Sequence, residues 1–501
     1  MAISPSAQYQ AGTTKAEQPR IDLLSEALIE RILDEAFQLM MSPGIKVLSA
    51  PARELLQAAG AETDSSSGIA RIPERVARAA LATAPKVFHL YDRLGHETVT
   101  YGGNAVQFDP GSSAVHVLDA ETLAHRSATT ADLVRLVKVA EQLPEYDAQS
   151  TALICDDVPR EIGDLYRLYL VLMYSIKPVI TGAFSKGSLR EMIDMLAMLA
   201  GGRQALASMP QAVFDVCPSP PLIWSDFGAH NLMELASARI PAEIVSMPLA
   251  GAAAPVTLLG AITQHAAECL SGITIHQLAN PGAPIVWGGA PAIFDMRKGT
   301  TPMGAVETAM IDASYAEVGK SLGLPTHCYL GASDSKLVDA QAGLESGMTA
   351  LLGALAGINM ISGAGMLDFL ACQSAEKLVV DAEVIGMTKR LLAGVHVRSG
   401  PLATAFFEGI NFKGEFLKQK ATRDLFSQEQ RLPSAVIDRD SMRGWQHAGR
   451  LDTFQRAKLR TKDLLQSYER PQPAVEHEAE LLAVVRSIAA DVGMPKIPDW
   501  R

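Results

Sequence analysis

The sequence has few cysteines, few aromatic residues and no excess of basic residues. Its five cysteines are scattered over 501 residues without a Cys-X-X-Cys pair, and an odd number of scattered cysteines is typical of reduced thiols in a cytoplasmic protein. Its 44 Lys and Arg are outnumbered by 55 Asp and Glu, so the formal net charge is −11. This charge excludes nucleic acid as an expected partner and agrees with a cationic substrate or a basic partner protein.

Long apolar segments are missing as well. The first 20 residues are polar, and no later segment offers about 18 apolar residues without an interrupting glycine or charge. We therefore expect no membrane span and a cytoplasmic location. The chain also lacks His/Cys clusters with zinc-ligand spacing and the phosphate-binding patterns GxxxxGK[ST] and strand-linked GxGxxG, so we expect no directly bound metal and no nucleotide cofactor.

The sequence does contain a repeated unit, in which a short apolar run is followed by an amphipathic segment. Eight such runs cover residues 105–111, 146–155, 178–184, 212–218, 242–248, 284–289, 326–331 and 358–365. Helical spacing of apolar residues follows them over 130–143, 160–176, 188–201, 227–240, 256–280, 304–323, 338–357 and 375–394. Strands that are apolar throughout, without alternating polar residues, and that are separated by single helices predict an α/β fold with a parallel sheet covered by helices. Eight such units close most naturally as a (β/α)8 TIM barrel. An open, doubly wound sheet is the alternative.

The composition divides the chain into four parts. Residues 1–20 are rich in Ser, Thr and Gln and are expected to be disordered, whereas 21–104 show helical spacing and are expected to form an N-terminal helical region. The barrel catalytic domain is expected over 105–398. Residues 399–501 have mixed charge and helical spacing, which predicts a C-terminal helical extension that packs on the barrel and allows a homo-oligomer.

A barrel keeps its chemistry in the loops at the carboxyl ends of its strands. The loop after the seventh strand is polar, and its candidate catalytic residues are Gly331, Ser333, Asp334 and Lys336. The other loops are small, apolar and proline-containing, which suits the docking of a large planar group. The candidate residues for that contact are Pro248, Gly251, Gly363 and Gly365.

Four motifs follow one another in the second half of the chain: Asp-Met-Arg at 295–297 with Gly299, Ala-Ser-Asp-Ser-Lys at 332–336, Asp-Ala-Gln-Ala-Gly at 339–343 and Gly-Ala-Gly-Met-Leu at 363–367. In this order they resemble the motifs of the trimethylamine methyltransferase superfamily, and the similarity covers the chain from about residue 20 to 450. The resemblance implies transfer of a methyl group from a methylated amine to the cobalt of a corrinoid (cobalamin). Because the chain has no DxHxxG corrinoid motif, a separate corrinoid protein is the expected carrier.

The trimethylamine branch of this family carries pyrrolysine near the end of strand seven, where this chain has ordinary residues from Tyr329 to Asp334. The resemblance therefore implies the non-pyrrolysine branch, some of whose members demethylate quaternary amines such as glycine betaine, the expected substrate. A quaternary ammonium already carries its charge, so attack by Co(I) releases a neutral tertiary amine and needs no proton donor. Alternatives are another betaine, another acceptor such as tetrahydrofolate, and a non-catalytic relative that binds a methylammonium or a corrinoid protein.

Such a site needs aromatic faces and only a modest acidic field, because the positive charge disappears as the methyl group leaves. Cation–π contacts contribute about 0.5–2 kcal/mol each. The aromatic candidates, each of which could instead be a packing residue, are Phe184, Trp224, Trp287 and Tyr329.

The carboxylate of a betaine would need a cationic or hydrogen-bonding partner, and Arg297, His327 and Lys336 are the candidates. Arg297 could instead form a salt bridge inside its own loop. His327 shares a strand face with Tyr329 and could instead be a structural residue. Asp334 is preferred over Asp295 for the site, although either could cap a helix.

Overall fold

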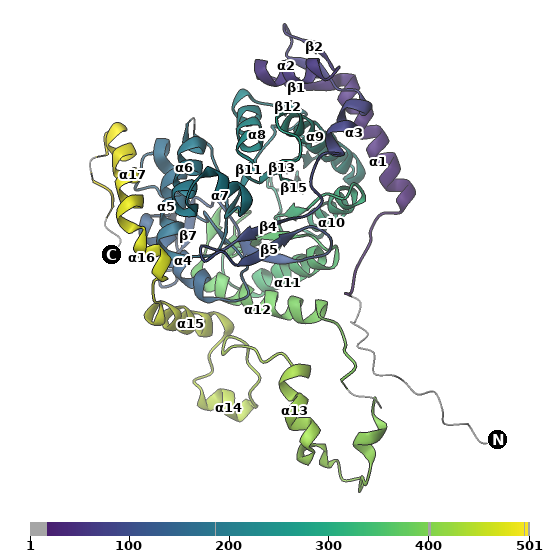
Figure 1. Ribbon diagram of the computed structural model, residues 1–501. Coiled ribbons are helices and arrows are strands. Elements are labelled where there is room, and N and C mark those ends of the chain that lie inside the picture. Colours follow the sequence, from purple (N-terminus) through teal and green to yellow (C-terminus); the bar gives the residue numbers. More distant parts are fainter. Residues whose placement is uncertain (1–17, 186, 399–401, 495, 499–501) are drawn as a thin grey trace, which may run out of the picture.

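The computed structural model describes residues 18–185, 187–398, 402–494 and 496–498 (Figure 1). Eight short parallel strands alternate with eight helices in an α/β arrangement, and each strand lies within one of the eight predicted runs, which are thereby confirmed. The strands are β6 (Gln107–Pro110), β9 (Gln149–Ser150), β10 (Val179–Gly182), β11 (Ala212–Val216), β13 (Ala242–Ser246), β15 (Ile285–Gly289), β17 (His327–Cys328) and β18 (Met360–Ala364).

These strands pair in two parallel sheets, in the orders β15-β13-β11-β10-β9 and β17-β18-β6. Two further contacts connect the sheets. Trp287 of β15 forms a parallel bridge with Thr326 beside β17, and the Asp147 N–H before β9 donates to the Phe108 carbonyl of β6 at 2.8 Å.

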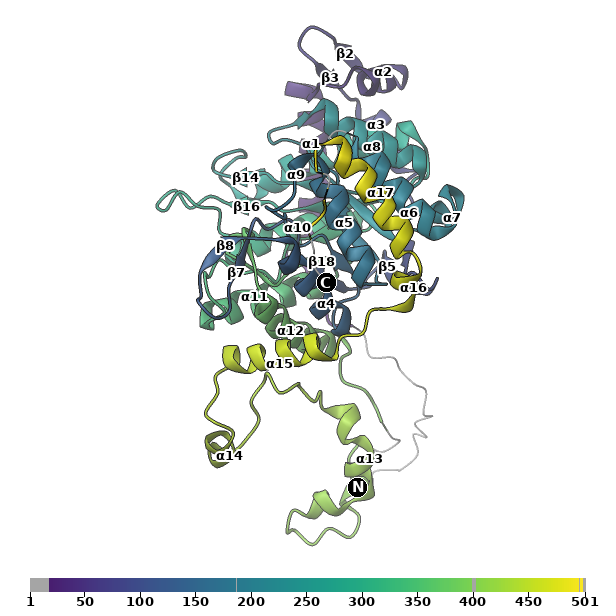
Figure 2. The same cartoon turned by 90° about the vertical axis from the view of Figure 1, so that its left-hand side faces the viewer.

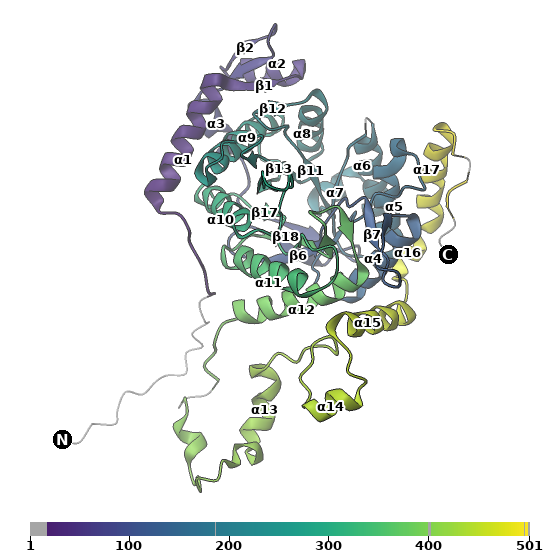
Figure 3. The ribbon, with the colours of Figure 1, turned by 180° about the vertical axis from the view of Figure 1, so that it is seen from behind.

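The eight predicted helices are also confirmed, with ends within a few residues of the predicted ones. They are α4 (Thr130–Gln142), α5 (Gly163–Tyr174), α6 (Ser188–Ala200), α8 (Asp226–Ala238), α9 (Leu258–Ala279), α10 (Val306–Ser321), α11 (Ala340–Leu355) and α12 (Ala375–Leu392). Ser225, Thr257, Asp339 and Ser374 cap four of them by accepting a backbone N–H three residues on. An additional short helix, α7 (Arg203–Ser208), was not predicted. Figure 3 shows the strands at the centre with the helices around them.

The N-terminal region differs from its prediction, because it contains strands as well as helices. The helices are α1 (Glu26–Leu39), α2 (Ala50–Ala58) and α3 (Glu74–Leu81), with a π-helical turn, η1 (Met40–Gly44). The strands are β1 (Ile45–Val47), β2 (Glu62–Asp64), β3 (Ile69–Arg71), β4 (Phe88–Tyr91) and β5 (Glu97–Tyr101). Strands of three to five residues are too short to leave a clear period in the sequence. The predicted disorder of residues 1–20 concerns mostly residues 1–17, which lie outside the described residues.

Small strands also lie in the loops that follow the main strands. They are β7 (His116–Leu118), β8 (His125–Ser127), β12 (Ile223–Trp224), β14 (Leu249–Ala250), β16 (Ala292–Ile293), β19 (Met366–Leu367) and β20 (Cys372–Gln373). One sheet has the order β19-β20-β7-β8, and β14 pairs with β16. Figure 2 shows β7, β8, β14 and β16 along one side of the molecule, which is the side of the carboxyl ends of the main strands.

The C-terminal segment is helical, and three of its helices pack on the helices of the α/β body. It comprises α13 (Lys420–Glu429), α14 (Met442–His447), α15 (Thr453–Ser467), α16 (Gln472–Glu476) and α17 (Glu478–Asp491), with two short 3-10 turns, η3 (Thr404–Phe407) and η4 (Glu415–Lys418). A third 3-10 turn, η2 (Arg160–Ile162), lies in the α/β body directly before α5. Helix α15 contacts α12 and α4, and α16 and α17 contact α5. The segment with α13 and α14 projects away from the body (Figure 3). Contact with a second subunit stays a prediction.

In the described part of the chain, no helix is both long and apolar enough to cross a bilayer.

Candidate functional site

The side chains on the inner face of the main strands, which is the face opposite the helices, form two layers. The first layer is apolar: Ile180, Val213, Val286 and Met360 pack with Ala148 against the β4–β5 hairpin residues Phe88, Leu90, Val99 and Tyr101. Strand side chains alternate between faces, so the residue two positions further along each strand returns to the inner face. On β11 and β18 that position holds Asp215 and Ser362. Close contacts join these two to Asp109 of β6, Glu243 of β13 and His327 of β17, and we call the five residues the acid layer.

Hydrogen bonds and a close contact between a histidine and a carboxyl group connect the acid layer across the strands. The His327 Nδ1 lies 2.8 Å from Glu243 Oε1, and the Tyr101 hydroxyl donates to Glu243 Oε2 at 3.4 Å. The other ring nitrogen of His327, Nε2, lies 2.9 Å from the Ser362 hydroxyl, which donates in turn to Asp109. Asp215 and Glu243 are cross-strand neighbours. The five strands therefore contribute to one connected polar cluster.

Tyr329 connects the acid layer with the carboxyl ends of the strands. Its hydroxyl donates to Asp215 Oδ2 at 3.2 Å and lies 2.9 Å from the Ser112 hydroxyl. Its ring meets that of His327 edge-on, with 5.0 Å between the centroids. The Tyr329 ring also belongs to a small apolar cluster with Val245, Ala292 and Met303. We call this cluster the apolar cover, because it lies above the acid layer on the strand-end side.

The carboxyl groups of the acid layer lack a full set of partners. Asp109 and Glu243 are fully buried and Asp215 is 6% exposed, yet Asp109 Oδ2 and Asp215 Oδ1 have no hydrogen-bond partner. Over the described residues, no lysine or arginine forms an ion pair with any of these three groups, and the ion-pair contact of Glu243 is with His327. A buried carboxylate without a cation is unfavourable. The layer is therefore suited to receive a compact cation.

Burial governs the protonation of these groups. Desolvation raises the pKa of Asp109 and Asp215 well above the ordinary value and raises the pKa of Glu243 to about 8. Desolvation also lowers the pKa of His327 to about 4. Near neutral pH these carboxyl groups therefore retain protons that exposed carboxyl groups would have lost, and the imidazole of His327 is neutral. Among the described residues, no three His, Cys, Asp or Glu side chains are placed to hold a metal ion.

Two of the predicted substrate-binding residues, His327 and Tyr329, lie in this site. Three others do not reach the acid layer. Strand alternation turns Trp287 to the helix side, where its Nε1 donates to the Tyr315 carbonyl of α10 at 3.0 Å. Trp224 lies on β12 and donates to Ser271 of α9 at 2.9 Å. Arg297 forms a salt bridge with Asp295 of its own loop, with Nη2 and Oδ2 2.7 Å apart. This is the alternative to substrate binding that the sequence offered for Arg297.

Phe184, the remaining aromatic candidate, is half exposed on the loop after β10. Its ring lies against Gly182, the last residue of that strand, where a Cβ would contact it. Phe184 is thus near the strand ends but outside the acid layer.

The polar loop after β17 holds the apolar cover in place. Asp334 Oδ1 accepts the backbone N–H groups of Met303 at 2.8 Å and Gly304 at 3.1 Å. The Ser333 hydroxyl donates to Glu345 at 2.6 Å. Burial, with a smaller contribution from Glu345, raises the pKa of Asp334 to about 6. Asp334 does not cap α11, since Asp339 does. The structure thus gives Ser333 and Asp334 a role in supporting Met303.

The other two predicted catalytic residues have contacts within the same group of loops. Lys336 Nζ donates to the Asp334 carbonyl, pairs with Asp368 at 3.2 Å and lies 3.8 Å from the centroid of the Phe369 ring. Gly331 adopts a left-handed conformation with φ of 84°, and its N–H donates to Thr349 of α11 at 3.0 Å. Neither residue contacts the acid layer.

The glycines predicted to accommodate a planar group are mostly required by the packing of the chain itself. A Cβ at Gly363 would collide with the backbone of Leu330 and Ala332, and one at Gly365 would collide with Gln373 and Leu378. The Gly365 N–H also donates to Asp381 at 2.7 Å. By contrast, Pro248 and Gly251 flank β14. A Cβ added at Gly251 would have Val256 as its nearest contact, at an ordinary van der Waals distance of 3.7 Å.

Sequence reasoning missed Asp109, Asp215, Glu243, Ser362 and Tyr101. The available signal was a single carboxylate within an otherwise apolar strand, as in AVQFDPG, AVFDVCP and AEIVSMP. A buried charge without a helical or turn role has to be satisfied inside the fold. Three such strands among the eight predicted runs would have indicated a shared polar site.

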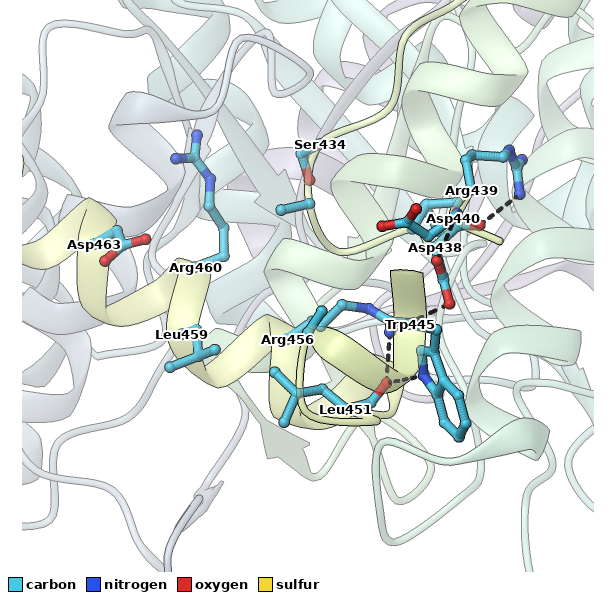
Figure 4. Close-up of a pocket in the computed structure, with 13 residues that line it drawn as sticks. Ser434, Asp438, Arg439, Asp440, Trp445, Leu451, Arg456, Leu459, Arg460 and Asp463 are labelled. Atoms are coloured by element: carbon cyan, nitrogen blue, oxygen red, sulfur yellow. Dashed lines mark hydrogen bonds and ion pairs between the residues drawn. The ribbon is translucent and has the colours of Figure 1, made fainter. Parts of the chain in front are cut away.

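A cavity of about 780 Å³ lies elsewhere, in the C-terminal extension (Figure 4). Its lining includes Arg456, which donates to the Leu451 carbonyl, and Trp445, which donates to the same carbonyl at 3.1 Å. Aspartate and arginine side chains both line it, and it shares no residue with the acid layer or with the predicted site residues.

Comparison with known proteins gives a consistent set of relatives. The family model described as trimethylamine methyltransferase (MTTB) matches residues 2–493. A trimethylamine methyltransferase of Desulfitobacterium hafniense is 28% identical over 483 residues, with 96% of each chain covered. The trimethylamine methyltransferase MttB1 of Methanosarcina mazei is 30% identical over 472 residues, covering 91% of this chain and 93% of the relative.

Two further similarities involve other methylated amines. A glycine betaine methyltransferase of Desulfitobacterium hafniense is 28% identical over 477 residues, with 95% of this chain and 98% of the relative covered. The crystal structure of the monomethylamine methyltransferase of Methanosarcina barkeri has a TM-score of 0.47 and 12% sequence identity, covering 90% of this chain and 96% of that one.

Proposed function

The chain belongs to the trimethylamine methyltransferase family, and we propose that it transfers a methyl group from a quaternary amine to the Co(I) of a corrinoid carried by a partner protein. Its relatives are named as methyltransferases of trimethylamine or of glycine betaine. The observation that carries the proposal is the acid layer, where two carboxyl oxygens lack a hydrogen-bond partner and no lysine or arginine of the described residues forms an ion pair with the carboxyl groups. Glycine betaine remains the first substrate to test.

The acid layer and the apolar cover together match the two parts of a quaternary ammonium. The carboxyl groups face the positive charge, while Tyr329, Val245 and Met303 offer apolar contacts to methyl groups. A strong field would stabilise the substrate more than the transition state, because the charge on nitrogen disappears as the methyl group leaves. Carboxyl groups that are partly protonated weaken that field. The residues then act by holding one methyl group in line with the acceptor.

The departing group needs no help from an acid. The C–N bond breaks, its electron pair stays on nitrogen, and a neutral tertiary amine leaves. The new bond to the methyl group uses an electron pair of the acceptor, and the corrinoid supplies this nucleophile when its carrier protein docks. No proton has to be donated to the nitrogen, so Tyr329 serves to position the substrate and not as a general acid.

The strand-end surface supports the approach of a large planar group. Met247, Val256 and Met296, which follow β13, β14 and β16, are 41%, 73% and 78% exposed. Exposed apolar side chains on neighbouring loops favour docking of a flat, partly apolar partner. Together with Pro248 and Gly251 they are the residues that we propose to face the corrinoid, whereas Gly363 and Gly365 support the loop packing.

We also propose that the eight main strands close as a (β/α)8 barrel. The Trp287–Thr326 bridge and the hydrogen bond from Asp147 to Phe108 support closure at the two junctions between the sheets. All five cysteines are free, which supports the expected cytoplasmic location.

The test is methyl transfer with purified protein. Cob(I)alamin is incubated with glycine betaine, choline or tetramethylammonium, and the absorption spectrum is followed for methylcobalamin. We expect conversion with at least one quaternary amine and loss of it in Asp215→Asn. Tetrahydrofolate in a parallel incubation separates the alternative acceptor. Binding of quaternary amines without methylation of any acceptor would instead favour a non-catalytic binding protein, and failure of both binding and transfer would contradict the proposal.

A further inference from the structure

Asp215 and Glu243 form a pair of adjacent carboxyl groups in the acid layer. They face each other across β11 and β13 in the strand register, and both side chains are buried. Neither carboxyl group forms an ion pair with a lysine or arginine of the residues that the structure describes. Ionisation of both would place two negative charges side by side in a buried layer, so this placement favours a pair that carries one proton between its two carboxyl groups.

We propose that the Asp215–Glu243 pair holds one shared proton in the empty site and releases it to solvent when a quaternary ammonium binds. The inference rests on the proposed function, because it takes a quaternary amine as the ligand. It adds that binding of the substrate is coupled to the protonation state of the site.

Among the residues that the structure describes, no titratable group around the pair is a better acceptor for this proton. Tyr101 faces it from β5, Asp109 from β6, and His327 and Tyr329 from β17, while Cys217 follows Asp215 after β11. None of these groups is a permanent cation, and burial favours the neutral form of His327. Two adjacent carboxylates buried without a counter-charge repel each other, so the empty pair retains one proton.

A quaternary ammonium reverses this balance without exchanging a proton itself. It has a fixed positive charge and no N–H group, so it can neither donate a hydrogen bond nor accept the shared proton. The Asp215 Oδ1 atom is buried and has no partner, which leaves it able to face the cation. The positive charge favours ionisation of both carboxyl groups, and the proton has to leave the site.

The structure contains a route for that proton. Asp215 Oδ2 accepts from the Tyr329 hydroxyl, which lies 2.9 Å from the Ser112 hydroxyl. Exposure rises along this chain, from the fully buried Glu243 through Asp215 to the partly exposed Ser112. Hydroxyl groups both donate and accept hydrogen bonds, so they connect the pair with the solvent at the strand ends.

The test is isothermal titration calorimetry of the purified protein with tetramethylammonium and with glycine betaine. Each ligand is titrated at pH 7 in phosphate and in Tris, whose enthalpies of ionisation differ. We expect the measured binding enthalpy to differ between the buffers by the amount that corresponds to release of about one proton per bound cation. Neither ligand titrates near this pH, so the proton has to come from the protein.

Two variants locate the source of the proton. In Asp215→Asn the pair can no longer share a proton between two carboxyl groups, and we expect the buffer dependence to fall by at least half. Asp312→Asn is the matched control, because Asp312 is a fully buried carboxyl group on α10 outside the acid layer, and its buffer dependence should equal that of the wild type. Circular dichroism checks that both variants fold.

The outcomes separate the inference from the proposed function. Binding with the same enthalpy in both buffers, or an unchanged buffer dependence in Asp215→Asn, overturns the shared-proton inference and leaves the proposed function intact. If no quaternary ammonium binds to the wild-type protein, both the inference and the proposed function fail.

Discussion

His327 and Glu243 meet across an intervening strand, with 2.8 Å between Nδ1 and Oε1, although β15 separates β17 from β13. Gly288 of β15 makes this contact possible. A Cβ at Gly288 would lie 3.0 Å from His327 Nδ1 and 3.1 Å from Glu243 Cγ. The absence of a side chain at one position of β15 thus allows two residues of the acid layer to pair.

Gly288→Ala should therefore impair methyl transfer. The added methyl group lies between His327 and Glu243 and 2.9 Å from the Ile244 carbonyl, so the acid layer has to shift. Overpacking of this kind costs about 1–3 kcal/mol, and we expect kcat/KM to fall at least about tenfold. Steady-state kinetics and denaturant unfolding measure the two effects. An unchanged kcat/KM would show that the His327–Glu243 contact does not contribute to activity.

Tyr329→Phe should weaken substrate binding while the fold is retained. The variant keeps the ring in the apolar cover but removes the hydroxyl that joins Asp215 and Ser112. Losing a buried hydrogen bond costs about 1 kcal/mol, which corresponds to a rise in KM of about fivefold. Phe184→Leu is the control, because Phe184 lies outside the acid layer and its replacement should leave KM for the amine unchanged. Equal effects of the two substitutions would contradict the position assigned to Tyr329.

The order of strands and helices could be predicted from the sequence, whereas most of the site could not. Apolar runs and helical spacing are local signals, and they located all eight strands and helices of the body. The acid layer depends on which strands are neighbours and on their register, as in the pairing of Asp215 with Glu243. Trp287 illustrates the limit: strand alternation decides whether it faces the substrate or α10, and the strand run alone does not specify that phase.

Asp334 should make the stability of the protein depend on pH. Burial raises its pKa from 3.8 to about 6 in the folded state, so folding favours the protonated form. The stabilisation is complete below pH 4 and is lost as the pH rises through about 6. Asp334→Asn stays neutral and can still accept from Met303 and Gly304. After allowance for solvent screening, we expect it to be more stable than the wild type by about 1 kcal/mol at pH 7 and not at pH 4.

Denaturant unfolding of both proteins at the two pH values measures this difference. Asp295→Asn is the matched control with the opposite sign, because hydrogen bonds from Arg297 lower the pKa of Asp295 to about 2. Its carboxylate stabilises the fold above pH 4, and that contribution is lost as the pH falls toward 2. A greater stabilisation of Asp334→Asn at pH 4 than at pH 7 would contradict the position of Asp334 beneath Met303.

Two glycines of the same region should respond in opposite directions to alanine. At Gly363 the new Cβ would meet the backbone of Leu330 and Ala332, which cannot move without shifting β17, so Gly363→Ala should destabilise the protein by about 1–3 kcal/mol. Gly343 lies in α11, and a Cβ added there would have no atom within 4 Å. Alanine favours a helix over glycine by about 1 kcal/mol, so Gly343→Ala should stabilise the fold. Thermal or denaturant unfolding compares the two.

Gly363 is constrained by the chain itself, so Gly363→Ala should lower stability even in the absence of any corrinoid. If the variant instead kept wild-type stability and lost only corrinoid-dependent activity, Gly363 would belong to the surface that contacts the acceptor.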